Sequence, residues 1–172
     1  MLGLEKGLVR LVEYAPEWKR YFEQEKIALQ TSLGSMILDI QHVGSTSIPG
    51  MIAKPIVDIA IAVDDFEESR ACIPLVERLG YEFRGELGIP RRHYFTKGNP
   101  RLFHIHMNEI KSREWQDQLL FRDYLRQNRK LAKEYAELKR QLARQYPRDR
   151  GAYLDGKTVF IKRVIQLARL SP

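Results

Sequence analysis

The sequence predicts an α+β fold, in which a mixed β-sheet with flanking helices is followed by a helical C-terminal region. Three observations support this prediction. Residues 55–63 are nearly all apolar, as in a strand that is buried on both faces of a sheet. Further short candidate strands follow up to residue 107, and residues 112–146 then carry an apolar stripe at helical spacing.

The first half of the chain alternates candidate strands with helices. A helix begins near Pro16, which suits a first helical turn, and ends at Gly34. Asp65 is positioned to cap a second helix, which Gly80 ends. Short strands are expected at 9–12, 36–43 and 55–63.

The second half changes from strands to helices. Gly98-Asn99-Pro100 predicts a hairpin turn. Strands are expected at 81–84, 93–97 and 101–107. One continuous helical region is expected over 112–146, with Lys139 away from its apolar stripe, and a last helix over about 157–170.

The length fits one domain, residues 1–172, with a sheet part at about 8–110 and a basic helical part at about 111–172. A hydrophobic content of 44% and a charged content of 30% are typical of soluble globular proteins. The chain shows neither a signal peptide nor an apolar run near the ~20 residues of a membrane helix. Its single cysteine, Cys72, excludes an internal disulfide. We therefore expect a cytoplasmic protein without a membrane partner.

The net charge of +7 is unevenly distributed. Residues 1–110 carry 13 Lys and Arg against 15 Asp and Glu, a balance of −2. Residues 111–172 carry 16 against 7, a balance of +9. This asymmetry favours an anionic partner such as a nucleotide, a polyphosphate or nucleic acid, although basic helical surfaces also serve solubility.

A turn of small polar residues, Gly44-Ser45-Thr46-Ser47, lies between two expected strands. Glycine lets the backbone approach a phosphate closely, and hydroxyls with free N–H groups can bind it. Lys54 and Asp58 follow at the start of the next strand, where a carboxylate could hold a magnesium ion on that phosphate. The alternatives are a turn that only reverses the chain and an Asp58 that pairs with Lys54 or with an arginine.

The stretch His42-Val-Gly-Ser-Thr-Ser-Ile-Pro-Gly-Met-Ile-Ala-Lys-Pro-Ile-Val-Asp58 resembles the GrpB family, a branch of the polymerase-β-like nucleotidyltransferase superfamily. The resemblance covers about residues 8–168 and implies a nucleotidyltransferase-like fold. Ala60 departs from the superfamily pattern, which has a second acidic residue there. Other segments that resemble the family are Val12-Glu-Tyr-Ala-Pro-Glu-Trp18, Gly80-Tyr81, Phe103-His-Ile-His106, Leu120-Phe-Arg-Asp-Tyr-Leu-Arg126, Tyr135-Ala-Glu-Leu-Lys139 and Gly156-Lys157.

His104 and His106 are two residues apart on an expected strand, so both side chains face one way. Together with Asp58 they form a candidate metal site, whose imidazoles suit zinc or manganese better than magnesium. Asp58 and His106 are the candidate catalytic residues, and we expect both to share one cleft with Gly44. The alternative is a pair of exposed histidines. Since Ala60 supplies no carboxylate, ordinary two-metal transfer is not expected.

Basic residues could meet the phosphate turn from a loop and from the helical part. Arg122 and Arg126 share a helix face, whereas Lys157 is expected at the start of the last helix. The alternatives are a solvated loop and surface ion pairs. The candidate phosphate-binding residues are Gly44, Ser45, Thr46, Lys54, Arg91, Arg92, Arg122, Arg126, Lys139 and Lys157.

Two functions follow from the resemblance. The first is a nucleotidyltransferase-fold protein that binds a nucleotide or other phosphorylated ligand and transfers a nucleoside monophosphate with a divalent metal (Mg, Mn or Zn). The second is a non-catalytic phosphate-binding module linked to coenzyme A or nucleotide metabolism, since family members are found joined to a dephospho-coenzyme A kinase. Nucleic acid is a weaker candidate partner, because few aromatics besides Tyr124 and Tyr135 are interleaved with the clustered Lys and Arg residues for base stacking.

Overall fold

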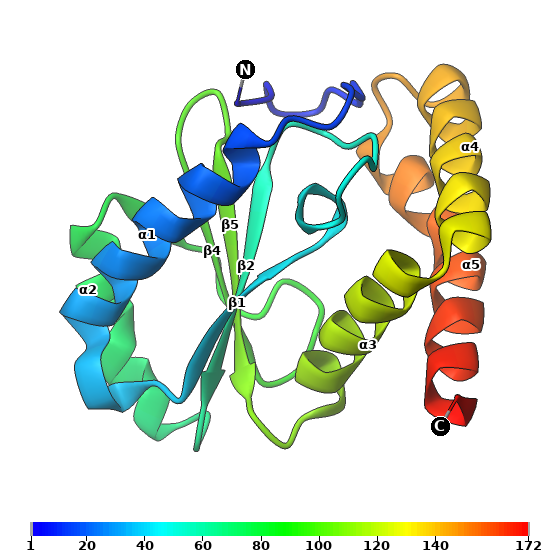
Figure 1. The fold of residues 1–172 in the computed structure, drawn as a ribbon. Helices are drawn as coiled ribbons and strands as arrows, with labels where there is room; N and C mark the ends of the chain where they lie inside the picture. Colours follow the sequence, from blue (N-terminus) through cyan, green and yellow to red (C-terminus); the bar gives the residue numbers. More distant parts are fainter. Residues whose placement is uncertain (1, 172) are drawn as a thin grey trace.

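A mixed sheet forms the centre of the molecule in a computed structural model that describes residues 2–171 (Figure 1). The strands occur in the order β1-β2-β5-β4-β3. β2 and β5 run parallel, and the other neighbouring strands are antiparallel. The strands are β1 (Asp39–Val43), β2 (Val57–Val63), β3 (Tyr81–Phe83), β4 (Arg92–Lys97) and β5 (Phe103–Glu109).

The pairing of β2 with β5 determines which side chains meet at the centre of the sheet. Asp58 lies opposite His104, and Ala60 lies opposite His106. Because alternate residues of a strand face the same side, Asp58 and both histidines project from one face. Ile59, Ile105 and Met107 project from the other face into the main hydrophobic core.

Helices cover both faces of this sheet (Figure 1). On the main-core face, α1 (Glu17–Leu33) packs through Trp18, and the short helix α2 (Ile73–Arg78) packs beside it. On the opposite face, α3 (Arg113–Gln127) places Trp115 against Ala60. The 3₁₀ helices are η1 (Gly34–Met36), η2 (Ser45–Ser47) and η3 (Glu68–Cys72).

The C-terminal helices α4 (Arg129–Gln145) and α5 (Arg150–Leu170) pack with α3 around a second hydrophobic core. At their contact, a Cβ atom on Gly156 would lie only 2.5 Å from Cδ2 of Leu142. A side chain at position 156 would therefore require the Leu142 side chain to shift or the two helices to move apart.

The expected elements of the first half are present with changed boundaries. The strand expected at 9–12 is wrong, because Val12 forms only an isolated bridge with Ala53. The strand expected at 36–43 begins at Asp39, since η1 precedes it. Asp65 accepts a hydrogen bond from the Glu68 backbone N–H, as its capping role predicted, but η3 precedes α2 where one helix was expected.

The expected helices of the second half also need correction. The region expected to be one helix over 112–146 is divided at Asn128, whose side chain accepts a hydrogen bond from the Leu131 N–H and caps α4. The last helix begins at Arg150 rather than near residue 157, because Asp149 caps it through the Ala152 N–H. Lys157 therefore lies inside α5 and does not begin it.

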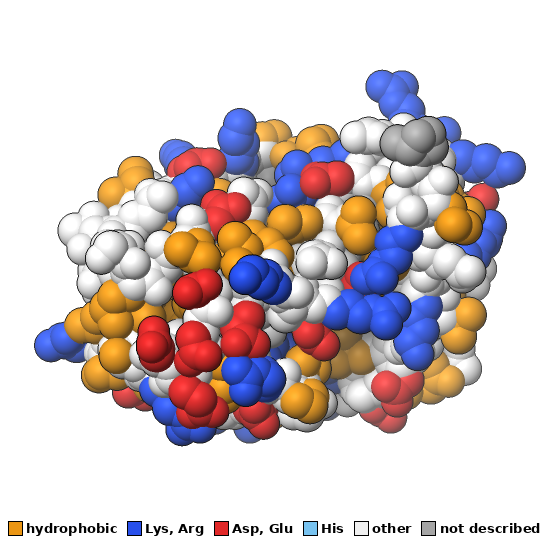
Figure 2. Space-filling view, turned by 90° about the horizontal axis from the view of Figure 1, so that it is seen from below, with side chains coloured by type: hydrophobic (Ala, Val, Ile, Leu, Met, Phe, Trp, Pro, Cys, Tyr) orange, Lys and Arg blue, Asp and Glu red, His pale blue; other side chains and the backbone are white. Residues whose placement is uncertain are grey.

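Acidic and basic side chains also occupy different parts of the surface. On the face shown in Figure 2, most Asp and Glu side chains gather on one side, and a group of Lys and Arg side chains lies on the other. Among residues 2–171, no helix combines the length and the apolar character required to cross a membrane.

Candidate ligand-binding site

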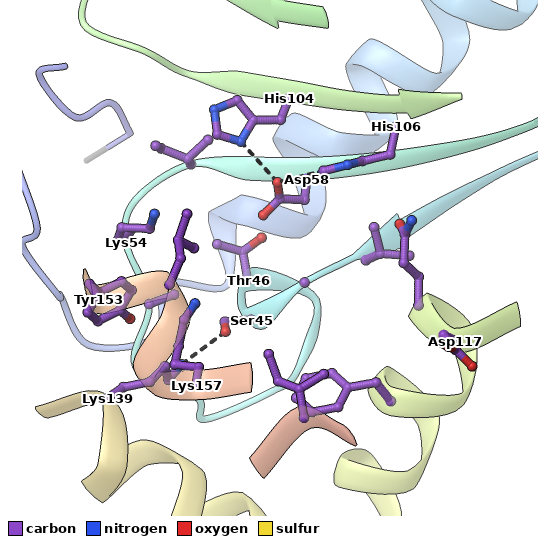
Figure 3. A pocket seen from close by; sticks show the side chains of 18 of the residues that line it. Ser45, Thr46, Lys54, Asp58, His104, His106, Asp117, Lys139, Tyr153 and Lys157 are labelled. Carbon is purple, nitrogen blue, oxygen red and sulfur yellow. Dashed lines mark hydrogen bonds and ion pairs between the residues drawn. The ribbon is translucent and has the colours of Figure 1, made fainter. Parts of the chain in front are cut away.

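A cavity of about 580 Å³ lies between the sheet and the C-terminal helices (Figure 3). The sheet side contributes the turn after β1 and residues of β2, β4 and β5, whereas the other side is formed by α3, α4 and α5. The predicted site residues that line it are Gly44, Ser45, Thr46, Lys54, Asp58, Arg92, His104, His106, Lys139 and Lys157.

Asp58 is the centre of the sheet side. Its Oδ1 atom lies 3.1 Å from Nδ1 of His104 and 3.2 Å from Nε2 of His106. Because an ionised carboxylate only accepts hydrogen bonds, both ring nitrogens donate. Burial alone would raise the pKa of Asp58, but the hydrogen bonds from the two histidines hold this pKa well below its usual value.

Neighbouring residues orient the two imidazoles. The ring of Tyr94 lies 5.5 Å from that of His104 and 5.2 Å from that of His106, centroid to centroid. Nη1 of Arg92 lies 3.5 Å from Nδ1 of His106. Since a guanidinium can only donate, this contact leaves the proton of His106 on Nε2, facing Asp58. Burial lowers the pKa of His104 despite its hydrogen bond to Asp58.

The three side chains fit a divalent ion by their donor atoms. One ligand atom from each of Asp58, His104 and His106 lies within 4.8 Å of the others. Ligand atoms bound to one zinc ion at about 2.1 Å lie roughly 3 to 3.5 Å apart. Asp58 Oδ1 lies 3.1 and 3.2 Å from the two ring nitrogens, which would have to release their protons to bind a metal. The side chains of Asp58 and His106 are 28% and 19% exposed, which leaves room for ligand oxygens. The Arg92 cation beside His106 lowers the affinity expected for a metal.

The turn after β1 is shaped by Gly44 and by hydrogen bonds. Gly44 has φ +70°, and a Cβ atom there would lie 2.7 Å from Oδ2 of Asp58. Ser47 Oγ donates to the Gly44 carbonyl oxygen at 2.6 Å. Thr46 Oγ1 lies 3.0 Å from Nε2 of His42, whose pKa burial lowers to about 4. His42 is therefore neutral and contacts the turn through Thr46, while Ser45 of the same turn lines the cavity.

Lysines form the opposite wall. Nζ of Lys139 donates to Ser45 Oγ at 2.9 Å and also to the Ile52 carbonyl oxygen. Lys139 is only 1% exposed, and burial holds its pKa well below its usual value. It lies on the buried face of α4 with Tyr135 and Leu142, so its expected assignment to another face was wrong.

Two further lysines flank the ring of Tyr153. Nζ of Lys157 lies 4.5 Å from the centre of this ring, and Nζ of Lys54 lies 5.5 Å from it. Burial lowers the pKa of Lys157 to about 7 and that of Lys54 to about 8. None of the salt bridges within residues 2–171 involves Lys54, Lys139 or Lys157.

Three predicted arginines lie outside the cavity. Arg122 donates from Nη1 to the His42 carbonyl oxygen at 3.0 Å, and Arg126 donates from Nη2 to the Ser47 carbonyl oxygen at 2.7 Å. Both guanidinium groups therefore support the turn from behind. Arg91 is half-exposed and forms an ion pair with Glu109 at 2.8 Å. The structure does not bring these three side chains to the predicted phosphate site.

Other cavity residues were missed by the sequence analysis. Arg150 and Tyr153 lie on the first turns of α5, in a segment that was not expected to be helical. Asp149 was the available signal, because an Asp before a helix is a common N-cap. Gln118 and Phe121 of α3 also line the cavity. Phe121 lies in the segment Leu120-Phe-Arg-Asp-Tyr-Leu-Arg126 that resembles the family, whereas no motif singles out Gln118.

Ala60 occupies the place where the superfamily pattern has its second acidic residue. Its methyl group is fully buried beside Trp115, and its neighbour on β5 is His106. A histidine therefore lies beside the position from which a carboxylate would project.

Comparison with known proteins places this arrangement in a family. Residues 8–167 match the family described as GrpB protein. UPF0157 protein YqkA of Bacillus subtilis strain 168 is 42% identical over 165 residues, which are 95% of this chain and 48% of YqkA. Glutamate-rich protein GrpB of Alkalihalophilus pseudofirmus is 36% identical over 171 residues, 96% of this chain and 98% of that protein. The chain thus spans about half the length of the first relative and nearly all of the second.

Similarity over a shorter segment occurs in a longer protein. A dephospho-CoA kinase of Mycolicibacterium paratuberculosis is 34% identical over 105 residues, which are 59% of this chain and 21% of the kinase.

Solved structures show the same fold. The crystal structure of GrpB from Enterococcus faecalis has a TM-score of 0.86 and 38% identity, and the match covers 92% of this chain and 96% of that one. The Cid1 poly(U) polymerase bound to Mg 3'-dATP has a TM-score of 0.54 at 16% identity, over 86% of this chain and 50% of the polymerase. This distant likeness extends only to the nucleotidyltransferase-like fold. The chain therefore belongs to the GrpB family.

Proposed function

We propose that this protein binds a nucleotide or another phosphorylated ligand, with the phosphates beside the Ser45 turn and next to Lys54, Lys139 and Lys157. The observation that carries this proposal is that Lys54, Lys139 and Lys157 line one cavity without a carboxylate partner among the described residues. Burial without an anionic partner disfavours the charged form of these lysines, as their lowered pKa values reflect, and a bound anion would favour that form again. A multiply charged phosphate supplies that compensation, and its oxygens accept several charge-assisted hydrogen bonds.

In the same proposal, Asp58, His104 and His106 hold a divalent ion (Mg, Mn or Zn) against these phosphates. The ion would neutralise phosphate charge that the lysines do not reach. Its two imidazole ligands favour Zn or Mn over Mg. The lysines and the Asp58 cluster face the same cavity, so one phosphate chain could contact both (Figure 3).

Binding is tested by calorimetry with tripolyphosphate, ATP, GTP and coenzyme A precursors, each with and without a divalent metal. Lys139→Met should weaken binding about tenfold to hundredfold, because it removes a charge-assisted contact. Lys133→Met is the matched control, since Lys133 is exposed on the same helix. Failure of every phosphorylated compound to bind, or equal binding by both variants, would contradict the proposal.

Nucleotidyl transfer is the second candidate function, because Cid1 shares the fold and Asp58 occupies one acidic position of the superfamily pattern. We expect weak or absent transfer to common acceptors, since Ala60 provides no second carboxylate. Labelled ATP with Mg or Mn and a panel of acceptors tests this expectation. Ala60→Asp alone should not create activity, because a carboxylate beside the buried Trp115 would lack a supporting environment. Robust transfer by the unmodified protein would show that another residue completes the site.

A link to coenzyme A metabolism belongs to the same proposal. Its support is the segment of a dephospho-CoA kinase that this chain resembles. Tighter binding of a coenzyme A precursor than of ATP would favour this link, and the reverse would favour a general nucleotide site.

A further inference from the structure

Lys157 presents its amino group to the cavity. The residue projects from α5, is half-buried and lines the cavity (Figure 3). Its Nζ atom lies 4.5 Å from the centre of the Tyr153 ring and forms no ion pair within residues 2–171. Lys139 differs, because its Nζ already donates to Ser45 Oγ and the Ile52 carbonyl oxygen, and its side chain is buried. A ligand in the cavity can therefore reach the amino group of Lys157 more readily than that of Lys139.

The charged groups around Lys157 are mostly cations. Lys54 lies just before β2, Arg150 begins α5, and Lys139 faces the same cavity from α4. Asp58 of β2 supplies the opposing negative charge. Burial above all, and then the charge of Lys54, lowers the pKa of Lys157 to about 7. About half of the Lys157 amino groups are therefore neutral near pH 7, and the neutral amine is the nucleophilic form.

Lys54 complements Lys157 as a proton donor. Its Nζ atom lies 5.5 Å from the centre of the Tyr153 ring, which Lys157 also contacts, so one aromatic side chain lies beside both amino groups. Burial lowers the pKa of Lys54 to about 8, which is above that of Lys157. At pH 7, Lys54 is therefore mostly protonated while Lys157 is half neutral. A nucleophile and an acid are thus available at one place in the cavity.

We propose that Lys157 is a nucleophile that forms an imine with a small aldehyde or ketone in the cavity, and that Lys54 supplies the proton that this reaction needs. Carbonyl compounds are the electrophiles with which a neutral lysine forms a covalent intermediate of this kind. This covalent chemistry goes beyond the proposed phosphate binding and does not depend on it.

The condensation is balanced without an oxidant or a reductant. The lone pair of Lys157 Nζ attacks the carbonyl carbon, so that a C–N bond forms and the π electrons of the C=O bond move to oxygen. One amine proton moves to that oxygen, which gives a carbinolamine. Lys54 then protonates the hydroxyl group, the C–O bond breaks, and water leaves. The remaining amine proton returns to Lys54, and a neutral imine is left.

The first test traps the imine with glyceraldehyde and sodium cyanoborohydride at about pH 7, and peptide mass spectrometry identifies the labelled lysines. Lys157 should be labelled at least about tenfold faster than Lys162, which is exposed on the same helix. Lys157→Met should lose this rapid labelling, whereas Lys162→Met, the matched control, should keep it. Labelling of Lys157 no faster than that of Lys162 would overturn the inference. Calorimetry with tripolyphosphate on the same protein tests the proposed function separately, so that either can fail alone.

The second test follows the ratio of Lys157 to Lys162 labelling as the pH changes. This ratio should be constant below about pH 7 and fall about tenfold per pH unit above it, because exposed lysines continue to lose protons up to about pH 10. A ratio that does not change with pH would overturn the inference. The ratio also cancels any effect of pH on the reduction step.

Lys54→Met tests the neighbouring cation. Removing this charge should raise the pKa of Lys157, so the pH at which the ratio begins to fall should move upward. Lys133→Met, at an exposed site on α4, is the control and should leave that pH unchanged. A purely structural role of Lys54 would slow labelling without moving the pH of the change. The same break in both variants would therefore overturn the part assigned to Lys54.

Discussion

The two walls of the cavity differ in how their charges are compensated. On the sheet wall, Asp58 accepts hydrogen bonds from His104 and His106, so the charged group is satisfied by its neighbours. On the helical wall, Lys139 and Lys157 have no carboxylate partner, and burial lowers the pKa of each. The charge of the sheet wall is thus compensated within the protein, whereas the lysines of the helical wall would gain an anionic partner only from the proposed ligand. The difference is consistent with the proposal that these lysines bind a ligand.

The largest expected effect concerns the organisation of the sheet wall. Gly44→Ala should lower the free energy of unfolding by about 3 kcal/mol, because the new Cβ atom would contact the Asp58 carboxylate and φ is positive. Gly50→Ala is the matched control: φ is +78° there, but nothing lies within 4 Å of the added Cβ. The free energy of unfolding of Gly50→Ala should therefore fall by only about 1 kcal/mol. Urea unfolding of both variants measures the difference, and equal losses would mean that the close contact with Asp58 is unimportant.

Removing the charge of the sheet wall should strongly weaken its affinity for metals. Asp58→Asn should weaken Zn or Mn binding about hundredfold, since the anionic ligand is lost while both histidines remain. Isothermal titration with Zn, Mn and Mg gives the affinities. Asp64→Asn is the control, because Asp64 is exposed just after the same strand. If Asp58→Asn binds metal as well as Asp64→Asn, the three side chains are not a metal site.

Arg122 is a useful contrast to the lysines of the cavity. It is also a basic residue of the helical part, but it donates hydrogen bonds within the protein. Arg122→Met should lower the free energy of unfolding by about 2 kcal/mol, since it leaves the His42 carbonyl and Gln41 amide oxygens without their donor. Tripolyphosphate affinity should change less than threefold, in contrast to Lys139→Met. Chemical unfolding and calorimetry on both variants separate the two roles. A larger loss of affinity in Arg122→Met than in Lys139→Met would place Arg122 at the ligand after all.

The smallest expected effect is a pH dependence of folding stability that Lys157 of the helical wall causes. The pKa of Lys157 is about 7 in the folded protein and about 10.5 in the unfolded chain, so the unfolded chain binds the additional proton between these values. This lysine therefore destabilises the fold fully below pH 7, and the penalty disappears as the pH rises toward 10.5. Lys157→Met should raise the melting temperature by a few degrees at pH 7 and less at pH 10. Lys162→Met, at an exposed site on the same helix, should show no such trend.

Much of the sheet wall could be predicted from the sequence, because its signals are local. The apolar run around Asp58 and the alternation of His104 and His106 require only the period of a strand. The helical wall was harder to predict, since Lys139 looked like one of many surface lysines. Its spacing of four residues from Tyr135 and three from Leu142 places it on the buried face, but no apolar side chain marked that position.

The helix boundaries explain the remaining errors. Asn128 interrupts the helical pattern without proline or glycine, and its role depends on the packing of α3 and α4 on α5. Arg122 and Arg126 share a helix face as predicted, but which surface this face meets is a tertiary property. Periodicity gives the direction of a side chain relative to its own helix and does not give the partner on the other side.

The close contact between Gly156 and Leu142 has a consequence for ligand size. Lys157 follows Gly156 on α5, and Lys139 lies one turn before Leu142 on α4, so the contact sets the spacing of two lysines that face one cavity. If a bulkier residue at position 156 moved the helices apart instead of displacing the Leu142 side chain, the span between the two lysine amino groups would widen. With the proposed phosphate ligand, a wider span would favour longer phosphate chains over short ones.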